Sequence, residues 1–333
     1  MRTLTDDTLT GMLERPRARG AFLLRTVLNP PWSLRIEDRA PLSLATMICG
    51  DAWVVPDDGD PIPMRPGDVA ILRGPDPYTI ADSPDTPPRI VIHPGQHCTT
   101  LEGEPLEEAM HLGVRTWGDR PDGSAVMLSG TYQMHSEIGR RLLGALPPVL
   151  VRPTGDGDSS LIALLAEETG KAEPGQELVL DRILDLLLVR VLRSWFASPG
   201  TGAPAWYRAQ HDPVVGSALR MLHGDPARPW TVAELAARTG VSRAGLARRF
   251  TELVGEPPMS YLTGWRLALA ADLLCEPDTT IGTVARKVGY SSSFALSAAF
   301  KRVRGISPQE YRRNAATSAR KLGGVPGMAM AFA

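Results

Sequence analysis

Apolar and polar residues alternate in short runs over the first third of the chain. Between Phe22 and about Thr100 the runs include LSLATMICG, DAWVVP, DVAILRG and RIVIHPG, and Pro, Gly and Asp separate them. Alternation with a period of two predicts strands. Turn residues recur about every ten positions, which is typical of a β-sandwich or a β-barrel.

The periodicity becomes helical from Ser159 to Ala197. One apolar stripe runs along this segment, formed by Leu180, Leu184, Leu187, Leu188, Val191 and Trp195. Ile183 and Leu186 widen the stripe beyond what a surface helix needs. The helix is therefore expected either to be buried within its own domain or to form the seam of a dimer. Pro199 to Pro204, rich in Gly and Pro, is expected to be a flexible linker.

A pattern of apolar residues and glycines occurs twice in the last third of the chain. The two copies are offset by 49 positions up to the glycine and by 50 beyond it, and F-x4-G-x2-P-x2-Y recurs with identical spacing. Such self-similarity indicates a duplicated structural unit. The matching positions are Leu235–Ala236, Gly240, Leu246, Phe250, Gly255, Pro258 and Tyr261, against Val284–Ala285, Gly289, Leu296, Phe300, Gly305, Pro308 and Tyr311.

Each copy predicts a helix, a tight turn and a second helix. Thr231 with Glu234 forms a capping-box pattern at the first helix, and Thr280 with Thr283 is its weaker counterpart. A glycine stands where each first helix must end in a left-handed residue, and serines follow as N-caps of the second helix. The inward stripes of the second helices are expected to be Leu246, Phe250 and Leu253, and Leu296, Phe300 and Val303.

This geometry is that of a helix-turn-helix, whose second helix presents its N-terminal part to the DNA major groove. Small hydroxyl side chains suit phosphates and base edges, and basic side chains neutralise phosphate. Arg248 is the favoured base reader, because its guanidinium matches guanine O6 and N7. Arg249 lies next to the core position Phe250 and is expected to snorkel or to contact the backbone. The candidate DNA contacts are Ser242, Arg243, Ala244, Ala247, Arg248, Arg249, Ser291, Ser292, Ser293, Phe294, Ser297, Lys301, Arg302 and Arg304. The alternative is a small helical protein-interaction domain with solvated arginines.

Charge is distributed unevenly along the 333 residues. From Trp206 to Lys321 there are 17 Lys and Arg against 9 Asp and Glu, whereas the rest of the chain has 19 against 28. A basic segment joined to an acidic one favours a polyanionic partner for the basic part. Three cysteines, a polar acidic start and the absence of long apolar runs predict a cytoplasmic protein with reduced thiols and no membrane span.

The C-terminal part resembles the DNA-binding domain of AraC-family transcription regulators. VAELAARTGVSRAGLARRF is similar to the first helix-turn-helix of that family, and GYSSSFALSAAFKRVRGISPQEYRR is similar to the signature over the second. The resemblance implies a joining helix from Met259 to Leu274 and two recognition helices in successive major grooves. Ala244, Ala247 and Ala298 replace the bulky polar readers of many members, which shifts readout towards DNA shape.

The N-terminal 190 or so residues resemble the cupin-type sensor of one AraC subfamily. PIPMRPGDVAILRGPDPYTIAD is similar to the strand-turn-strand of a cupin barrel, with the turn at Gly67–Asp68. Metal-dependent cupins bind the ion through closely spaced histidines and a glutamate. Here Tyr78 stands in place of the late histidine and no HxH precedes it. This departure argues against a cupin enzyme with an appended regulator, which is the alternative function.

One polar cluster in the first third leaves three interpretations open. His93, His97 and Cys98 lie within six residues, and Cys49 lies on an earlier predicted strand. They are candidates for a zinc or copper site. A thiolate beside histidines with a lowered pKa is a candidate for redox sensing through a Cys49–Cys98 disulfide. The third interpretation is a turn with a polar histidine pair and a buried structural cysteine.

The sequence thus predicts an α+β multidomain protein: an N-terminal cupin-like β-barrel plus helices, and a C-terminal all-α domain with two helix-turn-helix motifs. The expected segments are a sensor barrel at 1–125, a helical dimerisation segment at 126–198, a linker at 199–210, a DNA-binding domain at 211–316 and a disordered tail at 317–333. The expected function is a sequence-specific, non-enzymatic and cofactor-free transcription regulator, controlled by a small-molecule or redox signal at the N-terminal barrel. Its expected partners are double-stranded promoter DNA, a second copy of the chain, an unknown small-molecule effector and, for an activator, RNA polymerase.

Overall fold

The computed structural model describes residues 22–132, 136–153, 155–198 and 203–323, which form two compact units. We call the unit formed by 22–132 and 143–198 the sheet domain, and the unit formed by 136–142 and 203–323 the helical domain. Among the described residues, no helix is long and apolar enough to cross a membrane.

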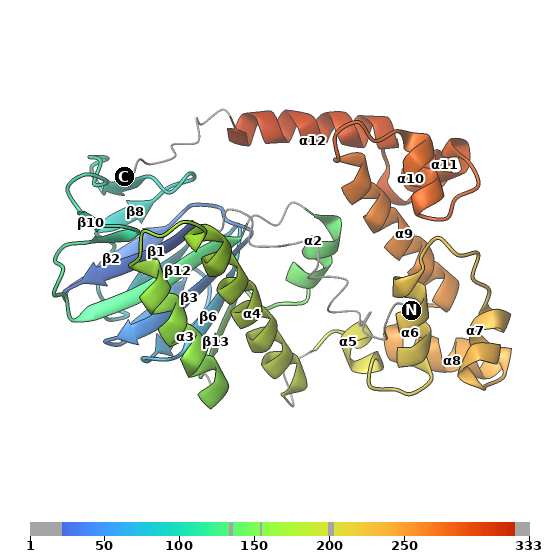
Figure 1. The fold of residues 1–333 in the computed structure, drawn as a ribbon, viewed down its shortest axis with the longest axis horizontal. Helices are drawn as coiled ribbons and strands as arrows, with labels where there is room; N and C mark the ends of the chain where they lie inside the picture. Colours follow the sequence, from blue (N-terminus) through green and yellow to red (C-terminus); the bar gives the residue numbers. More distant parts are fainter. Residues whose placement is uncertain (1–21, 133–135, 154, 199–202, 324–333) are drawn as a thin grey trace. The chain divides into compact units, whose positions relative to one another are not determined.

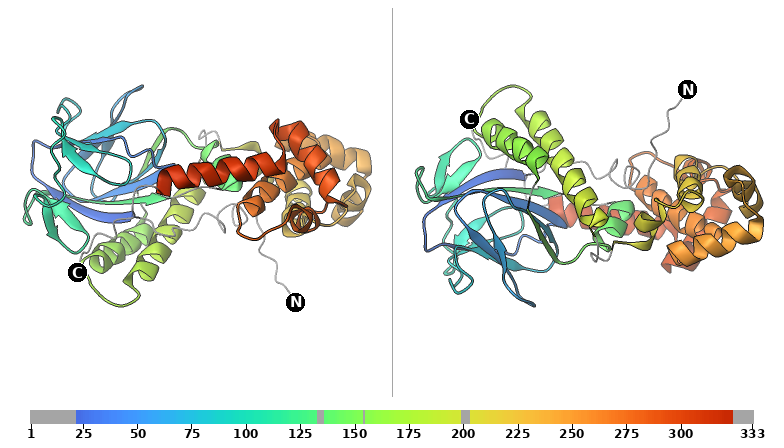
Figure 2. Two further views of the ribbon diagram at one scale, coloured as in Figure 1. Left: turned by 90° about the horizontal axis from the view of Figure 1, so that it is seen from above. Right: turned by 90° about the horizontal axis from the view of Figure 1, so that it is seen from below.

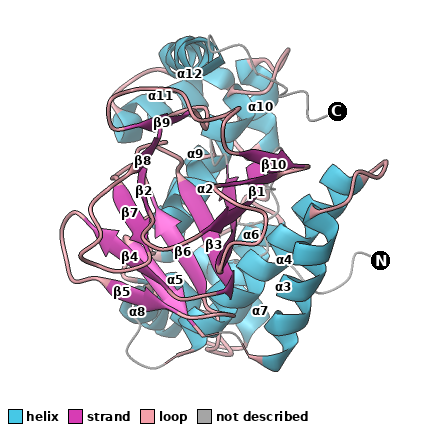
Figure 3. Cartoon of the chain, turned by 90° about the vertical axis from the view of Figure 1, so that its left-hand side faces the viewer, coloured by secondary structure: helices cyan, strands magenta, loops and turns pink. Residues whose placement is uncertain are grey.

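The sheet domain holds two hydrogen-bonded sheets (Figures 1 and 3). The first has the order β10-β11-β1-β12-β3-β6-β13 and the second the order β5-β4-β7-β2-β8-β9. Its strands are β1 (Phe22–Leu28), β2 (Ser33–Ile36), β3 (Leu42–Cys49), β4 (Ala52–Pro56), β5 (Ile62–Met64), β6 (Val69–Arg73), β7 (Tyr78–Ala81), β8 (Ile90–Ile92), β9 (Cys98–Thr100), β10 (His111–Gly113), β11 (Thr116–Gly118), β12 (Ala125–Tyr132) and β13 (Val149–Arg152).

The predicted strands and the α+β class are confirmed, but the described strands do not close into a barrel, because each sheet ends in its own edge strands. The core of this domain contains Trp32, Met47, Val54, Leu72 and Ile80, which come from both sheets. The boundary predicted at 125/126 falls at the start of β12, a strand inside the seven-stranded sheet. The segment expected to be helical therefore also supplies most of β12 and all of β13 to this sheet.

Helices α3 (Asp156–Thr169) and α4 (Gln176–Ala197) pack side by side (yellow-green in Figure 2), and α3 contacts β1 and β3 of the seven-stranded sheet. Because α3 covers one face of the sheet, β3 is buried along six consecutive residues, from Leu42 to Met47. The predicted stripe of α4 is buried within its own domain, where Tyr132 donates a hydrogen bond to the carbonyl of Leu184 at 2.9 Å. Leu186, which was assigned to that stripe, is 47% exposed.

The helical domain has two cores that share one long helix. The first core is formed by α5 to α8 with Tyr261 and Leu262 of α9, and the second by the rest of α9 with α10 and α11. This arrangement confirms the joining helix implied by the resemblance. The helices are α2 (Glu137–Leu143), α5 (Ala205–Ala209), α6 (Val215–Gly224), α7 (Val232–Thr239), α8 (Arg243–Val254), α9 (Pro258–Leu274), α10 (Ile281–Lys287), α11 (Ser293–Arg304) and α12 (Pro308–Gly323).

The chain segments around this domain differ from the prediction at both ends. Within the expected linker, Ala205–Ala209 forms α5, while 199–202 lie outside the described residues. The tail expected to be disordered from 317 instead continues α12 to Gly323, because PQEYRRNAATSARKLG contains mostly good helix formers. The remainder of the tail, 324–333, lies outside the described residues.

Candidate DNA interface and sensor cavity

The first helix-turn-helix consists of α7, a turn at Gly240 and α8. The Thr231 hydroxyl accepts the amide hydrogen of Glu234 at 3.1 Å, and the Ser242 hydroxyl accepts that of Gly245 at 3.1 Å. Both predicted N-caps are confirmed. The Glu234 carboxylate, however, pairs with Arg228 and Arg238, so the cap is not the reciprocal box that was expected.

The start of α8 presents a continuous exposed surface. Ser242, Arg243 and Ala244 are exposed, Ala247 is half-buried, and the Arg248 side chain is 78% exposed with a loose contact to Glu252 at 3.7 Å. Arg249 differs from its neighbour, because its guanidinium binds Asp212 at 2.6 and 2.9 Å. Burial opposes ionisation of Asp212, but hydrogen bonds from the backbone of Val215 and Val214 and from Arg249 hold its pKa below the usual value. Arg249 is therefore tied to its own domain.

The second motif repeats the helix, turn and helix, with one more residue in the turn and different side chains. The Ser292 hydroxyl caps α11 by accepting the amide hydrogen of Ala295 at 3.1 Å, and Thr280 caps α10 in the same way. Ser291, Ser292 and Ser293 are exposed, and Ser297 on the next turn is half-buried. Phe294 is 82% exposed at the start of the helix. A large apolar side chain thus stands where the first motif has Ala244.

The predicted inward stripes are correct at two of their three positions. Leu246, Phe250, Leu296 and Phe300 are fully buried, whereas Leu253 and Val303 are exposed. In the last turn of α8 the core contact passes to Val254 instead. The equivalent position of the second copy, 50 residues later, is Arg304, which lies against the ring of Phe300 with 5.9 Å between guanidinium carbon and centroid.

Arg304 is therefore separated from the two other basic residues at the end of α11. Lys301 and Arg302 are exposed, but Arg304 is largely buried and forms an ion pair with Glu137 of α2. The alignment of the two copies indicates that position 304 faces the domain interior, since the aligned residue Val254 is an apolar core position. Arg304 was assigned to phosphate on charge alone.

Helix α2 brings a carboxylate into the helical domain that sequence analysis did not identify. Glu137 binds Arg304 and Arg140, and it accepts the Tyr311 hydroxyl at 3.1 Å. The amide hydrogen of Glu137 is donated to Asp272 of α9 at 2.6 Å. In sequence α2 lies between β12 and β13, so no local pattern relates it to α11 or α12.

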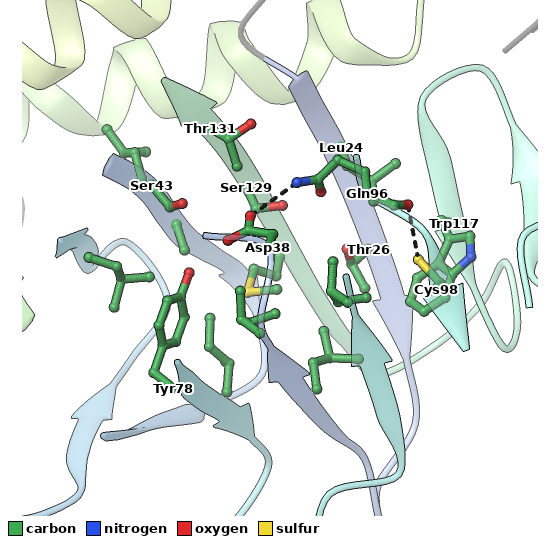
Figure 4. Close-up of a pocket in the computed structure, with 18 of the residues that line it drawn as sticks. Leu24, Thr26, Asp38, Ser43, Tyr78, Gln96, Cys98, Trp117, Ser129 and Thr131 are labelled. Carbon is green, nitrogen blue, oxygen red and sulfur yellow. Dashed lines mark hydrogen bonds between the residues drawn. The ribbon is translucent and has the colours of Figure 1, made fainter. Parts of the chain in front are cut away.

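A cavity lies inside the sheet domain (Figure 4). The empty space, including the open mouth of the cavity, is about 830 Å³. The volume that the centres of water molecules can reach is much smaller, about 80 Å³. Most of the wall is apolar, with Leu24, Leu34, Leu72, Ile80 and Trp117 from both sheets. The cavity is therefore narrow and largely hydrophobic.

Polar groups gather at one part of the cavity wall. Asp38, Ser43 and Tyr78 point towards the same space in Figure 4, and Gln96 donates to Asp38 at 3.0 Å. Burial, together with the charge of Asp38, raises the pKa of Tyr78 well above its usual value, against a hydrogen bond with Ser43 that lowers it. The described residues that line the cavity include two carboxylates and one thiol but no imidazole. They do not fit the histidine-rich ligand set of metal-dependent cupins.

The predicted cysteine and histidine cluster is only partly brought together. His93 hydrogen-bonds Thr99 at 2.9 Å, and His97 contacts Glu107 at 3.3 Å. Burial and then Glu107 raise the pKa of Cys98 to about 12, which is opposite to an activated thiolate. Cys49 is exposed at the end of β3, and all three cysteines are free. Among the described residues, no group of three or more His, Cys, Asp or Glu side chains is placed to hold a metal ion.

Comparison with known proteins agrees with both halves of this structure. The cupin family matches residues 7–197 and a helix-turn-helix domain matches residues 235–314. An AraC-like transcription regulator of Streptomyces antibioticus is 34% identical over 318 residues, covering 92% of this chain and 99% of its own length. One from Streptomyces lividans is 31% identical over 313 residues, with coverages of 92% and 98%. The regulator AlkR of Acinetobacter baylyi is 34% identical over 212 residues, with coverages of 62% and 67%. The chain therefore belongs to the AraC family of DNA-binding transcription regulators and carries an N-terminal cupin domain.

Proposed function

We propose that this regulator reads promoter DNA through the N-terminal turns of α8 and α11, and that a small molecule in the cavity of the sheet domain controls it. The observation that carries the DNA contacts is the matched pair of capped, exposed helix starts at Ser242 and Ser292. Both helices are anchored on α9, so one rigid element spaces the two readers.

The two helices offer different base chemistry. Arg248 is exposed and suits a guanine, whose O6 and N7 accept a bidentate guanidinium. Phe294 suits the methyl group of thymine, which is the apolar feature of the major groove. Ser291, Ser293 and Ser297 offer hydroxyls to phosphates or base edges, and Arg243, Lys301 and Arg302 offer charge to the backbone.

We further propose that the active form is a dimer, which for an activator would also contact RNA polymerase. The outward face of α4 supports a dimer, because Leu178 and Leu186 are exposed two turns apart on the helix. The buried stripe of α4 cannot supply this seam, since it already packs within its own domain.

The test begins with selection of duplexes from a random pool by the full-length protein. Affinity is then measured on the selected and a scrambled duplex over a range of salt concentrations, for the wild type and single variants. Arg248→Ala is expected to weaken the selected site by about 1–3 kcal/mol and the scrambled duplex less. Phe294→Ala should relax selection at a thymine. Lys301→Ala should weaken both duplexes equally and reduce the salt slope by about 0.9.

Arg65→Ala, exposed in the sheet domain and distant in sequence from α4, is the control and should leave binding unchanged. The stoichiometry of the complex reports whether two chains occupy one site. A pool that yields no preferred sequence would exclude sequence-specific regulation and favour the protein-interaction alternative. An equal loss on both duplexes for Arg248→Ala would reject that residue as a base reader.

A further inference from the structure

The cavity of the sheet domain has a distinctive balance of charge. Among the described residues that line it, Asp38 and Glu107 are the charged ones, and no Lys, Arg or His side chain is included. The rest of the wall is made of aliphatic, aromatic and hydroxyl-bearing side chains. Both carboxylates are partly buried, and a partly desolvated charge in apolar surroundings is stabilised by hydrogen bonds or by an opposite charge.

Glu107 is already compensated by its own domain. It accepts the amide hydrogen of Cys98 at 3.1 Å and contacts His97 at 3.3 Å. Burial opposes its ionisation, but backbone hydrogen bonds and His97 keep its pKa below the usual value. Glu107 is therefore ionised at neutral pH and satisfied without a ligand.

Within the described parts of the chain, the hydrogen-bond partners of Asp38 are neutral groups. One of its oxygens accepts the amide hydrogen of Ala40 at 3.0 Å, and the other accepts the side-chain amide of Gln96 at 3.0 Å. Gln96 has a left-handed φ of +64°, a conformation that non-glycine residues rarely adopt, and Arg39 beside Asp38 has one of +58°. Two strained turns thus hold this carboxylate at the edge of the cavity. Strain of this kind is concentrated at ligand-binding sites.

The hydroxyl groups near Asp38 complete a polar corner. Tyr78 is held in its protonated form by burial and by the charge of Asp38, and Ser43 hydrogen-bonds it. Both hydroxyl oxygens can accept hydrogen bonds from a ligand. A ligand group that donates several hydrogen bonds would meet a carboxylate and two hydroxyls here. An anionic group would meet a like charge, and the part of the wall that the structure describes offers it no basic side chain.

We propose that the effector of this regulator is a cationic apolar molecule, with a protonated amine against Asp38, Ser43 and Tyr78 and a slender hydrocarbon body along the apolar wall. This inference rests on the proposed sensing function and names its ligand class. The narrow space and the apolar wall select the hydrocarbon body of the ligand. The carboxylate of Asp38, which has no cationic partner among the described residues, selects the head group.

The test compares three molecules with the same eight-carbon body, namely octylammonium, 1-octanol and octanoate, by calorimetric titration of the full-length protein at neutral pH. Octylammonium is expected to bind at least 10-fold more tightly than octanoate, with 1-octanol between them. Asp38→Asn should remove the preference for the ammonium and leave the affinity for 1-octanol unchanged. Glu37→Gln is the matched control, because Glu37 is adjacent in sequence but does not line the cavity.

Three other outcomes of the titrations would contradict the proposal. Tighter binding of octanoate, equal binding of octylammonium and 1-octanol, or failure of all three to bind would overturn the assignment of a cationic ligand. The comparison in the wild-type protein does not depend on any variant folding. Operator affinity is measured separately with and without octylammonium: binding to the cavity that leaves operator affinity unchanged would reject the sensing function while upholding the ligand class.

Discussion

Gly240 and Gly289 occupy equivalent turns but differ in their surroundings, which allows a matched pair of substitutions. Both have left-handed φ angles, +73° and +82°. A Cβ atom at Gly240 would meet no other heavy atom within 4 Å. A Cβ atom at Gly289 would lie 2.4 Å from the carbonyl oxygen of Ala227 and 2.8 Å from its Cα atom.

The magnitudes follow from two separate effects. Alanine in the left-handed region costs about 1–2 kcal/mol at either position, and the lower entropy of its unfolded chain returns about 0.4–1 kcal/mol. Gly240→Ala is therefore expected to destabilise by about 1 kcal/mol. At Gly289 the clash is with backbone, and overpacking of that kind costs about 1–3 kcal/mol more. Gly289→Ala should destabilise by about 2–4 kcal/mol in total.

The neighbouring loop cannot move away easily. Arg266 of α9 donates to the carbonyl oxygens of Pro226 and Arg228, each at 2.7 Å, and so fixes the loop on both sides of Ala227. Since this loop joins α6 to α7, the clash at Gly289 also disturbs the contact between the two motifs. We expect operator affinity to fall more for Gly289→Ala than for Gly240→Ala.

The measurement is hydrogen exchange of the full-length variants, followed by mass spectrometry of peptides from both motifs: α7 and α8 report on Gly240→Ala, and α10 and α11 report on Gly289→Ala. This method reports the helical domain without interference from the sheet domain. Faster exchange in Gly289→Ala than in Gly240→Ala is the expected result. Equal exchange in the two variants would show that the close approach to Ala227 does not constrain the fold.

Two further predictions concern buried ionisable groups of the helical domain. Glu137→Gln should lower the free energy of unfolding by about 1.5–3 kcal/mol, because it removes the charge that pairs with Arg304. Thermal unfolding measures this effect, and Glu276→Gln, at an exposed position, is the control. Equal melting temperatures of the two variants would contradict the prediction. His223 is partly buried, and desolvation of its imidazole, with a smaller effect of Arg141, lowers its pKa to about 3. The unfolded chain then binds more protons below about pH 6.5, so stability should fall as the pH drops from 6.5 towards 3, by up to about 1.4 kcal/mol per pH unit. Urea unfolding between pH 7 and 5.5 should show a smaller decline for His223→Gln, and parallel declines would refute the assignment.

The duplicated motifs could be predicted from the sequence because their signals are local. Caps, turn glycines and short apolar stripes lie within a few residues of one another, and Thr231, Ser242, Thr280 and Ser292 all act as N-caps in the structure. The errors at Leu253 and Val303 arise in the last turn, where the helix leaves the core and periodicity alone no longer decides burial.

The sheet domain and α2 could be predicted only in part, since they depend on distant contacts. Alternation indicated strands but not their order, which pairs β1 with β11 and β12 and pairs β6 with β13. The cavity likewise assembles Asp38, Tyr78 and Gln96 from three separate segments. Tyr78 was singled out as a replacement for a metal ligand, and the structure places it in the cavity wall.

The two motifs share one scaffold but present unlike surfaces, and this difference has a consequence for the DNA. In the alignment of the two copies, Ala244 corresponds to Phe294 and Arg248 corresponds to Ala298. Each motif nevertheless has the same edge-to-face ring pair: the ring centroids of Phe250 and Tyr261 are 5.8 Å apart, and those of Phe300 and Tyr311 are 5.5 Å apart. The packing is therefore repeated, whereas the base-reading side chains are not. Under the proposed contacts, one motif favours guanine and the other thymine. A single chain then recognises a directional sequence, and the symmetry of a full operator must come from a second chain rather than from the duplication.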